Sequence, residues 1–110
     1  MIFDKDGNTS IVYQEKISIA TFLENLNKAY PKVKHDNLIV NLFSFEILAA
    51  GDVLEFLELS KNHKENGKSF VIVTNKVSYD EVPDEIMVTP TLQEAKDIIE
   101  MEEIERDLGL

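Results

Sequence analysis

The spacing of apolar residues along the chain changes repeatedly between the period of a strand and that of a helix. Short apolar runs predict strands, and apolar residues three or four positions apart predict amphipathic helices. The predicted strands are 1–3, 9–14, 37–43, 68–75 and 85–90, and the predicted helices are 18–30, 49–67 and 92–108. The order β-β-α-β-α-β-β-α predicts an α/β fold with crossover connections and a partly parallel sheet.

The first two strands flank the dipeptide Asp6-Gly7, which predicts a hairpin turn and so an antiparallel pair within a mixed sheet. The string "DKDGNTSIVYQE" also places Asp4, Asp6, Asn8 and Glu15 at the ligand spacing of a calcium loop. No helix enters this loop, and Thr9 occupies the position that requires glycine. We therefore favour the hairpin over the calcium site.

Each predicted helix has an apolar face and terminal signals. Thr21 with Glu24 offers a capping box for the first helix, with Ser18 as a rival cap, and Pro31 is expected to end it. Gly67 is expected to stop the second helix, and Thr91 with Glu94 forms a capping box for the third. The predicted inner face of the first helix consists of Ile19, Phe22, Leu23, Leu26 and Tyr30. That of the second consists of Ala49, Ala50, Val53, Phe56, Leu57 and Ser60, and that of the third consists of Leu92, Ala95, Ile98, Met101, Ile104 and Leu108. Residues 76–84 form a polar loop with room for one helical turn.

The composition is that of a globular protein: 110 residues, 44% hydrophobic and 29% charged. We expect one domain over residues 1–110, without disulfides because there is no cysteine. No signal peptide and no membrane-spanning run is visible, so a soluble cytoplasmic protein is expected. The net charge of −10 argues against partners such as nucleic acid and acidic membranes. Much of the acidity falls in the last helix, where a solvated face is the simplest interpretation.

Candidate catalytic chemistry is absent from the sequence. His35 and His63 are too few for a catalytic zinc site, and each is expected at the surface, His63 with its charge near a helix C-terminus. No nucleophile elbow or dinucleotide fingerprint occurs. We therefore expect no catalytic residues, no metal and no cofactor, and favour an interaction module over an enzyme.

Residues 37–107 resemble a STAS domain, the module of bacterial anti-sigma factor antagonists and of sulphate transporter tails. The resemblance is carried by the buried strand "NLIVNL", by the segment from "FSFEILAAGDVLEF" to "GKSFVIV", and by "PTLQEA" (90–95), which opens the last helix. It implies a STAS-like mixed sheet with amphipathic helices. It also implies a non-catalytic regulatory domain that binds a protein partner.

The loop that carries a phosphorylatable serine in that family departs from the family pattern here. It aligns with Leu48-Ala49-Ala50-Gly51, so alanine stands at the serine position in either register and cannot accept a phosphoryl group. Ser44 is a nearby substitute, although a serine after a strand is usually a turn residue. The resemblance therefore implies a domain that phosphorylation at the usual position does not control.

By the same resemblance, the partner-binding residues are Leu48, Ala49, Ala50, Gly51 and Asp52. The chain's acidity favours a partner with a basic patch. An alternative is that Ala49 and Ala50 are only the first turn of a buried helical stripe. Two other functions stay open: a small-ligand or nucleotide-binding domain that uses the same strand-to-helix loop, and a homodimer.

Overall fold

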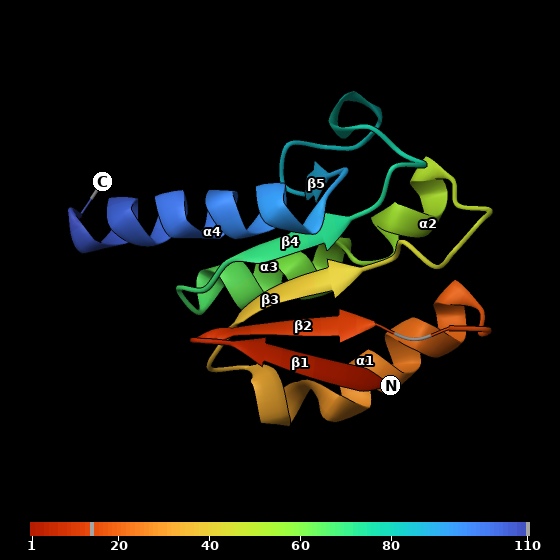
Figure 1. Cartoon of the computed structure of the whole chain (residues 1–110), viewed down its shortest axis with the longest axis horizontal. Helices are drawn as coiled ribbons and strands as arrows, with labels where there is room; N and C mark the ends of the chain where they lie inside the picture. Colours follow the sequence, from red (N-terminus) through yellow and green to blue (C-terminus); the bar gives the residue numbers. More distant parts are fainter. Residues whose placement is uncertain (14, 110) are drawn as a thin grey trace.

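Five strands form one sheet in the order β1-β2-β3-β4-β5, so each strand lies beside its predecessor in the chain (Figure 1). The computed structural model describes residues 1–13 and 15–109. The strands are β1 (Ile2–Asp6), β2 (Thr9–Tyr13), β3 (Asn37–Asn41), β4 (Phe70–Val73) and β5 (Met87–Thr89). The helices are α1 (Ile19–Val33), α2 (Ala50–Leu54), α3 (Leu57–Glu65) and α4 (Leu92–Asp107), with a 3₁₀ turn, η1 (Tyr79–Glu81), before β5.

The predicted mixed sheet is confirmed. β1 and β2 pair antiparallel, and the remaining neighbours pair parallel. Asp6 pairs with Thr9, so the two turn residues are Gly7 and Asn8, one position later than the Asp-Gly signal suggested. Gly7 has a φ of +60°, which suits glycine at the first position of a tight hairpin turn.

Alternate residues of the central strands face two separate apolar layers. Val12, Leu38, Val40, Phe70 and Ile72 pack with buried side chains of α1, α2 and the α2–α3 junction. Ile11, Ile39, Val71 and Val73 pack with Ala95 and Ile99 of α4. The sheet therefore lies between α1, α2 and α3 on one face and α4 on the other (Figure 1).

Helix α1 runs past the proline that was expected to end it. Pro31 lies in the last turn and removes only one backbone donor there, and the helix continues to Val33, which is buried. At its start, the Ser18 side chain accepts a hydrogen bond from the Thr21 N–H at 3.1 Å, so Ser18 is the cap rather than Thr21.

The single helix predicted over 49–67 is two helices. The N–H groups of Glu55 and Phe56 donate to carbonyls three residues back, at 3.3 and 3.0 Å, which tightens the chain between α2 and α3. The turn places the Phe56 ring edge-on to that of Phe22, with 6.0 Å between ring centroids. Gly67, with a φ of +79°, follows α3 as the predicted helix stop.

The apolar face predicted for α4 is correct only in the first half of the helix. Consecutive residues are about 100° apart around a helix, so each step of three residues falls about 60° short of a full turn. The predicted stripe therefore winds away from the sheet. Ala95 and Ile99 are buried, whereas Met101, Ile104 and Leu108 are exposed. Ile99 is the core residue that the predicted stripe omitted.

Candidate docking site

The loop of residues 42–49 leads from the carboxyl end of β3 into α2, at one end of the molecule (Figure 1). Its first turn is set by Asn41, whose side-chain oxygen accepts a hydrogen bond from the Phe43 N–H at 3.0 Å. β3 therefore ends at Asn41, two residues earlier than predicted. Leu42 is buried and Phe45 packs edge-on against Phe22, so these two residues anchor the loop to the core.

The five residues expected to bind a partner are neighbours in the fold but differ in exposure. Leu48 is buried, Ala50 and Asp52 are half-buried, and Ala49 and Gly51 are exposed. Ala49 therefore does not belong to a buried helical stripe, and that alternative is wrong for it. Ala50 packs partly against the core. The accessible part of the predicted set is Ala49 and Gly51, with the outer surfaces of Ala50 and Asp52.

The N-terminus of α2 is closed by one side chain. The Ala49 N–H donates to the Asp52 carboxylate at 2.9 Å, and Ala49 itself contributes no capping oxygen. Asp52 lies in the first turn of α2, where a negative charge is favourable beside the helix dipole. Asp52 therefore has a structural function at this helix start.

Two exposed apolar residues of the loop were missed by the sequence analysis. Ile47 is 92% exposed and Phe43 is 53% exposed. Phe43 was assigned to the end of a buried strand because the run "NLIVNLF" is nearly continuous in its apolar character. The available signal was Asn41, which interrupts that run and favours a turn. Glu46 and Glu55, both exposed, add negative charge on either side of the α2 start.

Gly51 lies inside α2, and the fold itself does not require a glycine there. Its φ is not positive, and a Cβ added to it would meet no atom within 4 Å. We expect Gly51→Ala to raise the free energy of unfolding by up to about 1 kcal/mol, since alanine is the better helix former. Urea denaturation checks this. Gly67→Ala is the matched control and should destabilise, because Gly67 has a φ of +79°.

At the opposite end of the strands, His63 is fully buried, so the prediction of a surface histidine is wrong for it. Its Nε2 lies 2.8 Å from the backbone oxygen of Asp36 and its Nδ1 lies 2.6 Å from the Tyr30 hydroxyl. A carbonyl oxygen only accepts, so Nε2 carries the proton and Nδ1 accepts from the hydroxyl. Burial lowers the pKa of His63. The hydrogen bond to the Asp36 backbone raises this pKa, and the positive charge of Lys68 lowers it further. The ring is therefore a neutral structural group.

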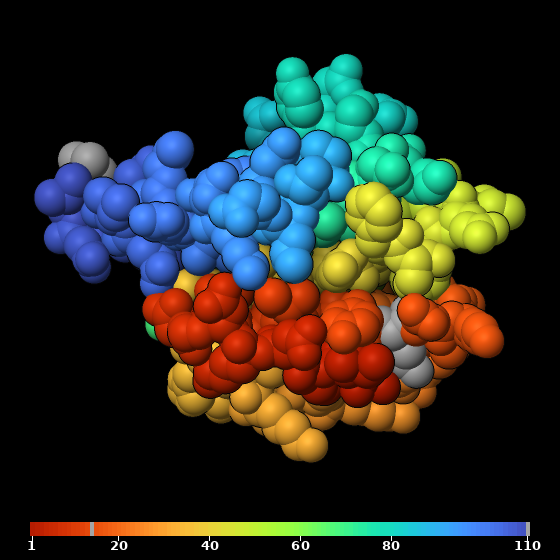
Figure 2. All heavy atoms as spheres, viewed as in Figure 1, coloured from red at the N-terminus to blue at the C-terminus, as the bar shows by residue number. Residues whose placement is uncertain are grey.

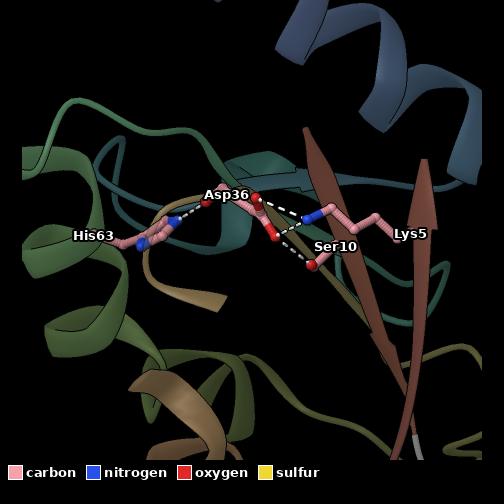
Figure 3. A network of polar contacts seen from close by, with 4 residues as sticks. All are labelled: Lys5, Ser10, Asp36 and His63. Atoms are coloured by element: carbon pink, nitrogen blue, oxygen red, sulfur yellow. Dashed lines mark hydrogen bonds and ion pairs between the residues drawn. The ribbon is translucent and has the colours of Figure 1, made fainter. Parts of the chain in front are cut away.

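Asp36 joins His63 to the hairpin (Figure 3). Its carboxylate accepts from the Ser10 hydroxyl at 2.9 Å and pairs with the Lys5 ammonium at 3.1 Å. Partial burial alone would raise the pKa of Asp36, but hydrogen bonds from Lys5 and Ser10 and the charges of Lys5 and Lys68 lower it overall. This network fixes the positions of α3 and β1 relative to the start of β3.

A cavity of about 550 Å³ opens at the carboxyl ends of β4 and β5, between the η1 segment and α4. Its lining is mainly apolar: Val77, Tyr79, Met87, Val88, Pro90 and Ile98, with Thr74, Asn75, Ser78, Thr89 and Glu94. The hydroxyls of Thr74 and Thr89 already bond to backbone groups of the loops that follow them. Among the described residues that line the cavity, Glu94 is the only acidic one and none is basic.

Two further properties concern ions and membranes. Within residues 1–13 and 15–109, no group of three or more histidine, aspartate or glutamate side chains is arranged to hold a metal ion. The helices of the described residues include none long and apolar enough to span a membrane.

Comparison with known proteins identifies the fold. No protein-family model matches the chain, and no curated protein matches its sequence. Among solved structures, the chain is similar to RsbS from Moorella thermoacetica, in a variant with one serine-to-glutamate substitution. The two share 17% sequence identity with a TM-score of 0.59, over 89% of this chain and 95% of the other. The protein therefore has the STAS-like fold that the sequence resemblance implied.

Proposed function

We propose that this protein is a non-catalytic, regulatory STAS-like domain that binds a protein partner at the start of α2. The docking surface consists of Ile47, Ala49, Ala50, Gly51 and Asp52, with Leu48 supporting it from beneath. Ile47 carries the proposal: an isoleucine 92% exposed on the loop is an apolar contact without a function in the fold. The small side chains of Ala49 and Gly51 beside it leave room for a partner's backbone.

The charge around this surface defines the partner further. Glu46 and Glu55 are exposed, and Asp52 lies between them along the chain. The partner is therefore a protein with a basic patch around an apolar pocket that receives Ile47. Phosphorylation at the usual family position does not control this contact, because Ala49 and Ala50 stand there and alanine has no hydroxyl.

Partner capture from native cytosol, read by mass spectrometry, tests the surface. The baits are the wild-type protein, Ile47→Arg and Ile104→Arg, with melting curves to show that all three are folded. Both variants carry the same substitution at an exposed isoleucine, one in the loop before α2 and the other in the second half of α4, and these two segments lie at opposite ends of the molecule (Figure 1). A protein retained by wild type and Ile104→Arg but lost with Ile47→Arg supports the docking surface. The docking surface is contradicted if all three baits retain the same proteins, or if none of them retains any protein.

A second candidate function is small-ligand binding, which the cavity beside β4 and β5 favours. Its apolar lining without a basic side chain suits a neutral or weakly polar ligand better than a nucleotide, whose phosphates would have no cationic partner. A ligand at a hundredfold excess over its Kd should stabilise the protein by about 2.7 kcal/mol. Melting curves with apolar fragments and a nucleotide panel separate the two classes.

A further inference from the structure

The second half of α4 presents an apolar stripe to solvent. Met101, Ile104 and Leu108 are 61%, 53% and 67% exposed, and their spacing of three and four residues places them on one side of the helix. Ala95, Ile99 and Arg106 lie on the opposite side, which faces the sheet. Figure 2 shows this half of α4 projecting from the body of the protein. The stripe is therefore a free surface that makes no contribution to the core.

The position of the stripe is fixed by contacts on the inner side of α4. The Arg106 guanidinium donates to the Ser69 hydroxyl at 3.1 Å and to the Asn37 side-chain oxygen at 3.3 Å. Glu103 accepts a hydrogen bond from the Asn8 amide at 2.6 Å. Ser69 and Asn37 are both buried, so these bonds hold the helix against the end of the sheet. The stripe is thus presented on a preorganised helix, which lowers the entropy that a partner must remove.

The charge around the stripe selects what can cover it. Helix α4 has seven carboxylates and two basic side chains, so this helix carries half of the chain's net charge of −10. Lys96 pairs with Asp6 at 3.1 Å, and the guanidinium of Arg106, an exposed residue, donates to Ser69 and Asn37, so both basic side chains have partners on the side of the helix away from the stripe. Glu100, Glu105 and Asp107 are exposed around it. Two copies of this face would bring like charges together, which disfavours a homodimer here.

We propose that Met101, Ile104 and Leu108 form a second docking surface, which binds a basic amphipathic helix of a partner protein. The partner's apolar residues would cover the stripe, and its lysine or arginine side chains would pair with Glu100, Glu105 and Asp107. This surface lies at the end of the molecule opposite the start of α2 (Figure 1). A protein with both surfaces could join two partners, and the second surface stands whether or not the first one binds.

A designed peptide pair tests this surface. One peptide is a helix with leucine at i, i+3, i+4 and i+7 flanked by lysine, and the other has glutamate in place of each lysine. We expect the lysine peptide to bind saturably, to shift the amide NMR signals of residues 100–109, and to weaken at least tenfold with Ile104→Gln. The glutamate peptide should not bind. Ile2→Gln, at an exposed isoleucine of β1 outside both proposed docking surfaces, is the matched control and should leave the Kd of the lysine peptide unchanged.

Three results would overturn the proposal. The first is that the lysine peptide does not bind, and the second is that Ile104→Gln binds it as tightly as wild type does. The third is a concentration-dependent dimer in sedimentation that Ile104→Gln abolishes, because the stripe would then belong to a second copy of this chain. Ile104 is half-exposed and outside the core, so melting curves of Ile104→Gln should match those of wild type.

Discussion

Phe22→Ala should lower the free energy of unfolding by about 3–5 kcal/mol, the usual cost of deleting a buried ring. Phe22 is fully buried in α1, and its ring lies edge-on to both Phe45 and Phe56, with 6.0 Å between centroids in each pair. It therefore joins α1, the loop before α2 and the α2–α3 junction. A loss of this size is a large part of the roughly 5–15 kcal/mol that stabilises a typical domain.

Chemical denaturation of two control variants separates the loss of the buried ring from the effect of replacing a phenylalanine as such. Phe43→Ala makes the same substitution at a residue that is 53% exposed, and should change stability by about 0.5 kcal/mol or less. Phe22→Leu keeps most of the volume and should cost about 1.5 kcal/mol or less. Equal losses for Phe22→Ala and Phe43→Ala would show that the three-ring contact does not stabilise the protein.

His63→Ala should cost about 2–5 kcal/mol, because it leaves a cavity and removes the donor to the Asp36 carbonyl. It should also change the response of stability to pH. The pKa of His63 is lowered in the folded protein, so the unfolded chain binds more protons between that pKa and the unfolded value of about 6.5. This part of the stability is fully present above about pH 6.5 and is lost as the pH falls through the lowered pKa.

Urea titrations between pH 8 and pH 5 measure both effects. The difference in stability between wild type and His63→Ala should narrow as the pH falls, since only the unfolded wild type gains a proton that its folded form excludes. His63→Gln is the control: it retains an amide that can donate to Asp36 but does not titrate. It should therefore lose less stability than His63→Ala and share its pH profile. A difference that stays constant across this range would refute the neutral, buried imidazole.

Local patterns were sufficient to predict most elements of the fold. Short apolar runs located the five strands, and apolar residues three and four positions apart located the helical segments. Gly67 and Thr91 marked helix ends correctly, whereas at α1 the cap is Ser18, the rival of the predicted Thr21. Two of the errors share a physical cause, because each depends on a contact distant in sequence. The break between α2 and α3 follows from packing Phe56 on Phe22, and the burial of His63 follows from its hydrogen bonds to Tyr30 and Asp36.

The position of the loop that leads into α2 was predictable, but the exposure of its residues was not. The resemblance placed the partner-binding residues at 48–52, which span the end of this loop and the first turn of α2. Exposure was not predictable, because Ile47 and Leu48 are adjacent aliphatic residues and only the course of the loop decides which of them turns inward. The exposed stripe on α4 has a different origin, since apolar residues spaced three apart drift around a helix by about 60° at each step.

The order of the strands has a consequence for how the chain folds as it is synthesised. Because every strand pairs with the one before it, each new strand leaving the ribosome finds a formed neighbour, and no strand must wait for a later one. The face that contains Ile11, Ile39 and Val71 is different, since its cover, α4, follows all five strands in the chain. A nascent chain that ends before α4 therefore exposes this apolar face, and a chaperone would find its binding site there.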